Sequence, residues 1–173
     1  GLRSQIAPPG WREQYAVLAR SESEAVRERA LELAVLYGDR PQMARLEDLV
    51  MKRAPSTLAA RRRALELLLA KRDPEFVRSL LTLIPTDALR ADVIRALAAY
   101  DLPEIPARLV AIYPMLTLAE RQDAIQTLTA RSDFALALLD AIEDGQIARQ
   151  DVSALVIRQL QALKDKSVDQ RLA

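Results

Sequence analysis

The chain contains no cysteine and no histidine among its 173 residues. The lack of cysteine excludes disulfides, thiolate nucleophiles, iron–sulfur sites and cysteine-ligated zinc within this segment. The lack of histidine excludes histidine-based triads and histidine-ligated metals. Covalent attachment of a haem through a CxxCH motif is excluded as well, because the motif needs both cysteine and histidine. We therefore expect a segment that is not an enzyme, with no catalytic residues, no metal ligands and no cofactor of its own.

Glycine and aromatic residues are also scarce, with four Gly, four Tyr, two Phe and one Trp. Ala, Leu, Arg and Glu dominate instead, a mixture that favours helix and offers little to a sheet. No unbroken apolar run is long enough for a membrane span, and no leader resembles a signal peptide. The chain begins with Gly1, and residues 168–173 end it in the middle of a helical pattern. Both ends lead us to expect that the chain is an excerpt from a longer protein. The composition predicts an all-α protein.

The net charge of the chain is +1, so no global field attracts a polyanion. Residues 1–86 hold 15 Lys and Arg against 11 Asp and Glu, which gives +4. Residues 87–173 hold 10 against 13, which gives −3. This gradient from basic to acidic is mild and does not indicate a nucleic-acid-binding chain.

A short motif, Arg-x-x-small-apolar, recurs along the chain. Its small residue falls at positions 30, 64, 93, 124 and 156, at intervals of 34, 29, 31 and 32 residues. In the last copy Ser153 replaces the arginine. The copies occupy residues 26–34, 61–68, 90–97, 121–128 and 153–160. A regular interval of this length indicates a repeat architecture.

An aspartate lies eight or nine residues after the small residue of each motif, and we predict that it caps a second helix. The aspartates are Asp39, Asp73, Asp101, Asp133 and Asp165. Aspartate at a helix start accepts a hydrogen bond from a free backbone amide, and a proline after it suits the first turn. Two motif helices are predicted to start at capping boxes, Ser21-x-x-Glu24 and Thr117-x-x-Glu120. An earlier helix is expected over residues 11–20. Each repeat is thus expected to be a pair of helices.

Both helices of a pair carry an apolar stripe, and one pair alone cannot bury both. Stacking of successive pairs buries them, so we predict one domain over residues 1–173, a right-handed α-solenoid of about five helical pairs. The exposed ends of such a stack favour self-association. Trp11 is expected to close the N-terminal end of the core.

The first motif carries Val26, Arg27, Ala30 and Leu31, and it is followed by a short turn with Asp and Pro. This pattern resembles the HEAT repeat family, and it covers the chain from about Ser21 to the end. The resemblance implies a scaffold that docks other domains of the same chain or another protein. We expect the docking surface along the motif helices.

A narrower resemblance covers residues 96–163, with the phrases "ERQDAIQTLTAR" and "LLDAIEDGQIARQDVSA". This stretch is similar to the helical region of large exported bacterial proteins of the planctomycete–verrucomicrobial type. In those proteins a dehydrogenase-like β-propeller precedes the helices, and a c-type haem domain with CxxCH follows them. The resemblance implies an interdomain module of an exported haem-binding protein, and hence an extracytoplasmic location.

Four basic residues form the candidate interaction surface: Lys52, Arg53, Arg62 and Arg63. Their neighbour Arg61 belongs to the repeated motif, so we expect it to cap carbonyl groups or to pair with an acid of an adjacent repeat. A solvated helix face is the favoured interpretation of the other four. The alternative is a nucleic-acid-binding domain that resembles alkylpurine DNA glycosylases. Those proteins place Trp, Asp and Arg near the lesion, whereas the single Trp11 of this chain lies at its extreme N-terminus. The acidic C-terminal half argues against nucleic acid as a partner.

Overall fold

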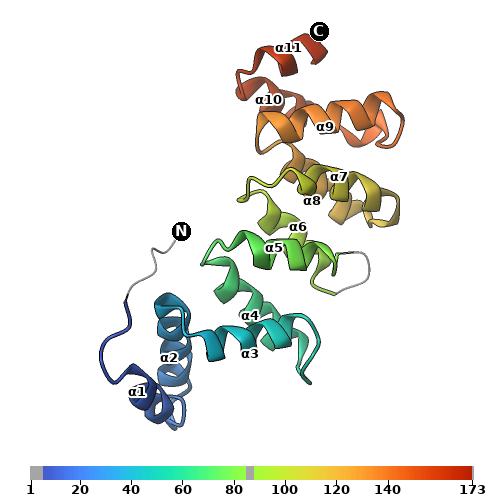
Figure 1. The fold of residues 1–173 in the computed structure, drawn as a ribbon. Helices are drawn as coiled ribbons and strands as arrows, with labels where there is room; N and C mark the ends of the chain where they lie inside the picture. The colour runs from blue at the N-terminus through green and yellow to red at the C-terminus, as the bar shows by residue number, and fades with distance from the viewer. Residues whose placement is uncertain (1–5, 85–87, 173) are drawn as a thin grey trace. The chain divides into compact units, whose positions relative to one another are not determined.

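The computed structural model describes residues 6–84 and 88–172. These residues form eleven α-helices and two short 3-10 helices, and they contain no β-strand (Figure 1). The prediction of an all-α protein is confirmed. Among the same residues, no helix combines the length and the apolar character that crossing a bilayer requires.

Motif helices alternate with second helices along the chain. The motif helices are α2 (Glu24–Tyr37), α4 (Leu58–Leu69), α6 (Arg90–Leu97), α8 (Leu118–Leu128) and α10 (Ala154–Ala162). The others are α1 (Trp11–Leu18), α3 (Arg40–Val50), α5 (Pro74–Leu81), α7 (Glu104–Ile112), α9 (Ser132–Glu143) and α11 (Lys166–Leu172). The two kinds of helix that the repeats predict therefore alternate along the chain.

The chain divides into two compact units, residues 1–76 and residues 77–173, with the boundary inside α5. In the first unit α2 contacts α1, α3 and α4, and α3 packs along α4. Trp11 is buried against Tyr15 and Tyr37, and its indole N–H donates to Asp39 at 3.1 Å. Trp11 is thus a core residue of this unit, as expected.

In the second unit like helices lie beside like helices. The motif helix α6 packs on the motif helix α8, while α7 packs on α9 and α9 on α11 (Figure 1). The core between them is fully buried and consists of large apolar side chains. It includes Ile94, Leu97, Ile105, Leu109, Leu128 and Phe134.

Three of the five repeated aspartates cap a second helix. Asp39 accepts from the Gln42 amide at 3.3 Å at the start of α3. Asp73 accepts from the Glu75 amide at 2.9 Å, directly before α5. Asp165 accepts from two amides at the start of α11, at 2.9 and 3.2 Å. At these positions the prediction of helix capping is confirmed.

For Asp101 and Asp133 the prediction is wrong. Helix α7 begins only at Glu104, and the carboxylate of Asp101 pairs with Arg131 at 3.3 Å instead. Helix α9 begins at Ser132, so Asp133 lies inside its first turn rather than before it. There its charge still complements the positive end of the helix dipole. At Asp101 a nearby cation replaced the cap, and at Asp133 the helix starts two residues earlier than a cap at this position requires.

Of the two predicted capping boxes, only the one at Thr117 forms. The Thr117 side chain accepts from the Glu120 amide, and the Glu120 side chain accepts from the Thr117 amide. The box at Ser21 is wrong, because the Ser21 hydroxyl accepts from the Ser23 amide and α2 starts at Glu24. The structure adds two N-caps that were not predicted, Thr57 of α4 and Ser153 of α10.

Replacing Asp39 with alanine should lower the free energy of unfolding by about 1.5 kcal/mol, since both a helix cap and the Trp11 indole lose their acceptor. The matched control is Asp101→Ala, where an exposed ion pair is lost and a change of less than about 0.5 kcal/mol is expected. Urea denaturation followed by circular dichroism measures both. Equal losses in the two variants would contradict the assignment of the caps.

Candidate functional site

The motif arginine of the second copy, Arg61, is a buried structural residue. Its side chain lies on α4 and only 5% of it is exposed. Nε donates to the carbonyl of Leu49 at 3.2 Å, and Nη2 donates to the carbonyl of Val50 at 2.8 Å. These carbonyls lie at the end of α3, where backbone acceptors outnumber the available amide donors, and the Leu49 carbonyl also accepts from the Lys52 amide at 3.3 Å. The expectation that Arg61 caps carbonyl groups is confirmed.

Two other motif arginines, Arg27 and Arg121, also donate to backbone carbonyls. Arg27 donates to the carbonyls of Ser21 and Glu22, at 2.7 and 2.9 Å. Arg121 donates to the carbonyl of Pro114 at 3.4 Å, and its guanidinium lies 5.2 Å from the centre of the Tyr113 ring. The arginines of the repeat are therefore part of the framework.

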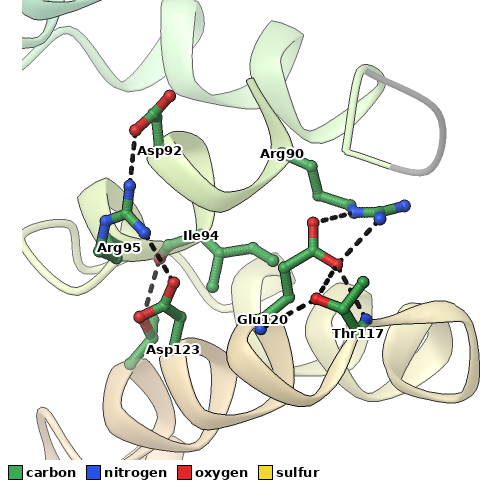
Figure 2. Close-up of polar contacts among 8 residues, drawn as sticks. Arg90, Asp92, Ile94, Arg95, Thr117, Glu120 and Asp123 are labelled. Atoms are coloured by element: carbon green, nitrogen blue, oxygen red, sulfur yellow. Dashed lines mark hydrogen bonds and ion pairs between the residues drawn. The ribbon is translucent and has the colours of Figure 1, made fainter. Parts of the chain in front are cut away.

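Arg90 binds an acid of the next helical pair, as Figure 2 shows. Its guanidinium forms two parallel hydrogen bonds with the Glu120 carboxylate, at 2.8 and 2.9 Å. The hydrogen bond from Arg90, with those from Thr117, lowers the pKa of Glu120 to about 2. This pair links α6 to α8, and a second ion pair joins Arg95 to Asp123 at 2.7 Å.

Arg53 and Arg63 of the predicted interaction surface pair with acidic side chains. Arg63 pairs with Glu32 of α2 at 2.6 Å and with Glu66 at 3.4 Å. Hydrogen bonds from Arg29 and Arg63 lower the pKa of Glu32. Arg63 is thus engaged between two motif helices, and it is not the freely available cation that the sequence suggested.

The remaining members of that surface are exposed. Arg53 pairs with Asp48 at 3.5 Å. Lys52 follows the end of α3, and Arg62 lies on α4. Asp48 and Glu32 partly neutralise Arg53 and Arg63, and an interaction role for the four basic residues remains a prediction.

A groove between the second helices α7 and α9 offers a different surface, which we call the acidic groove. It has a volume of about 730 Å³. Its floor is apolar and made mainly of small side chains, and its other lining residues are mostly aspartates. The lining is Asp101, Pro103, Pro106, Ala107, Val110, Ala111, Asp133, Phe134, Ala137, Asp140, Ala141, Asp144 and Gln146.

The four aspartates of the acidic groove differ in their partners. Asp101 pairs with Arg131 at 3.3 Å, and Asp140 pairs with Arg171 at 2.8 Å. Asp133 and Asp144 form no side-chain hydrogen bond or ion pair with any residue that the structure describes. Their charges are therefore available to a ligand.

Sequence reasoning assigned the recurring aspartates to helix caps and did not find the acidic groove. The sequence signal that could have revealed the groove is the spacing of three aspartates along α9 and at its end. Asp133, Asp140 and Asp144 are separated by seven and four residues. Residues at that spacing share one face of a helix. The docking surface expected on the motif helices remains a prediction, whereas this groove lies on the second helices.

Within residues 6–84 and 88–172, no group of three or more acidic side chains is arranged to hold a metal ion. The aspartates of the acidic groove are spread along it rather than convergent. They present negative charge to a ligand larger than an ion.

Comparison of the chain with protein-family models, with curated proteins and with solved structures finds no match. The resemblances to HEAT repeats and to the exported haem-binding proteins therefore remain predictions.

Proposed function

We propose that this chain is a HEAT-like α-solenoid that acts as a non-catalytic scaffold and docks a protein partner or a neighbouring domain. The supporting observation is a recurring side-chain bond between a helix and its counterpart in the next pair. The bonds are Glu32–Arg63, Arg78–Glu104, Arg90–Glu120, Ile94–Thr127, Gln126–Gln159 and Glu143–Arg171. Their partners are separated by 26 to 33 residues, or about one repeat.

Nearest-neighbour bonding of this kind is typical of stacked repeats, in which each unit contacts only the next one. Stacked helical pairs present long surfaces, and docking is the usual consequence of such surfaces. The acidic groove gives the proposal its most concrete support. It combines an apolar floor with two aspartates that have no internal partner. A surface with these properties suits binding rather than chemistry.

The context of the scaffold follows from the resemblance of residues 96–163. We place it between a β-propeller and a c-type haem domain of an exported dehydrogenase-like protein. The complete gene provides the test of this context. A propeller upstream and a CxxCH motif downstream support it, and a separate reading frame of this length contradicts it.

The alternative of a nucleic-acid-binding domain receives less support. Trp11 is 6% exposed and therefore inaccessible to a base. Arg63 is occupied by Glu32, and the acidic groove carries negative charge. Phosphate groups require the opposite charge.

Small-angle X-ray scattering of the purified chain tests the solenoid. A compact globular protein of 173 residues has a radius of gyration of about 16 Å. A stack of five helical pairs should exceed this value and give an asymmetric distance distribution. A radius near that of a compact globule would contradict the solenoid.

A further inference from the structure

We propose that the acidic groove between α7 and α9 binds a basic amphipathic helix of a partner protein. The inference rests on the proposed scaffold function and names its ligand class. The aspartates would pair with Lys or Arg of the ligand, and the apolar floor would receive its apolar side chains. This is the mode in which grooves between helices bind peptides.

The two helices present matching stripes to the groove. On α9 the stripe consists of Asp133, Ala137, Asp140, Ala141 and Asp144, the last just after the helix end. It extends over eleven residues, or about 16 Å at 1.5 Å per residue. This length corresponds to three turns of a ligand helix.

The opposite wall comes from α7 and the residue before it. Its groove-lining positions are Pro103, Pro106, Ala107, Val110 and Ala111, spaced by three and four residues along one face. Ala107 and Ala111 are exposed. Because small side chains dominate the floor on both sides, the larger apolar side chains of a ligand helix have room to enter.

The charge of the lining selects the ligand. Four aspartates line the groove, and none of the described residues that line it is Lys or Arg. Arg131 and Arg171 partly neutralise Asp101 and Asp140, whereas Asp133 and Asp144 keep their full charge. These two lie eleven residues apart near the ends of the stripe. A ligand with cations at both ends of an apolar stretch complements this pattern, and an acidic or nucleic-acid ligand does not.

A synthetic helical peptide of about 15 residues tests the proposal. It carries lysines separated by seven and four residues on one face, with leucines between them on that face. Two controls are a scrambled peptide of the same composition and the same peptide with glutamate in place of lysine. Fluorescence anisotropy measures binding to the complete chain at low salt, about 0.05 M, and again at about 0.5 M.

Two kinds of variant separate charge from shape. Asp133→Asn with Asp144→Asn removes the two unpaired charges, and Ala111→Trp fills the groove from an exposed position. The matched control is Glu22→Gln with Asp169→Asn, which removes two exposed charges outside the groove.

We expect the affinities of the wild type and the control for the lysine peptide to agree within twofold. The double Asp variant should bind at least about fivefold more weakly, since each exposed pair contributes modestly. High salt and Ala111→Trp should weaken binding as well.

The proposal is overturned if the scrambled or glutamate peptide binds as tightly as the lysine peptide. Equal binding by the double Asp variant and the wild type would also overturn it. Self-association of the wild type that Ala111→Trp abolishes would assign the groove to a second copy instead. Absence of peptide binding by a chain that scatters as a solenoid would reject this ligand class and leave the scaffold architecture intact.

Discussion

Replacing Arg61 with alanine is expected to lower the free energy of unfolding by about 3 kcal/mol. The guanidinium is buried, and it satisfies the carbonyls of Leu49 and Val50 at the end of α3. Alanine would leave both carbonyls without this donor in a place where water has little access. It would also remove the packing of the long side chain against α3. Urea denaturation followed by circular dichroism measures the loss.

Two further variants show whether the loss comes from the carbonyl contacts. Arg62→Ala changes the exposed neighbour and should cost less than about 0.5 kcal/mol. Arg61→Lys should give an intermediate loss, because an ammonium group cannot reproduce the fork of a guanidinium that reaches two acceptors. If Arg61→Ala and Arg62→Ala were equally stable, Arg61 would have no framework role.

Replacing Glu120 with glutamine is expected to lower the free energy of unfolding by about 2 kcal/mol at neutral pH. Arg90 and Glu120 are 20% and 14% exposed, so solvent screens their two hydrogen bonds only in part. Glutamine keeps the shape of the side chain but loses the charge, so the two charge-assisted hydrogen bonds between Arg90 and residue 120 are weakened. The same change weakens the capping box at Thr117.

The effect should depend on pH. The pKa of Glu120 is lowered to about 2 in the folded chain, mainly by the hydrogen bond from Arg90. In the unfolded chain its pKa is close to the ordinary value of about 4.3. A lowered pKa stabilises the fold fully above the unfolded value, and this stabilisation is lost as the pH falls toward the folded value. The difference between wild type and Glu120→Gln should therefore shrink between pH of about 4.5 and about 2.

The matched control is Glu104→Gln, which breaks the ion pair with Arg78 at 3.0 Å. Arg78 and Glu104 are 41% and 46% exposed, so water screens this pair and the unfolding free energy should change little. Urea denaturation at a series of pH values measures both variants. A Glu120→Gln difference that stays constant at low pH would contradict the role of the charge.

Helix content and the alternation of helices could be predicted from the sequence because both depend on local patterns. The motif arginines were recognised as framework residues since they recur in register. The starts of individual helices were less predictable. Asp101 turned to Arg131, a residue thirty positions away, and the Ser21 hydroxyl bonded two residues ahead rather than at α2. Local capping rules do not include such competing partners.

The surfaces were the hardest part to predict. The cluster around Arg62 looked uniformly basic because the sequence does not show that Glu32 lies beside Arg63. The acidic groove depends on two helices about thirty residues apart, and neither stripe alone indicates a groove. Asp133 and Asp144 became a candidate site only when α7 was found beside α9.

The bonds between successive helical pairs bear on how the chain folds. They join residues only 26 to 33 positions apart. Closing such short loops costs little chain entropy, and proteins rich in near contacts fold quickly. In the proposed stack, a pair emerging from the ribosome would dock on the pair made just before it, without waiting for distant parts of the chain. Synthesis and folding would then proceed in the same direction, from the N-terminus onward.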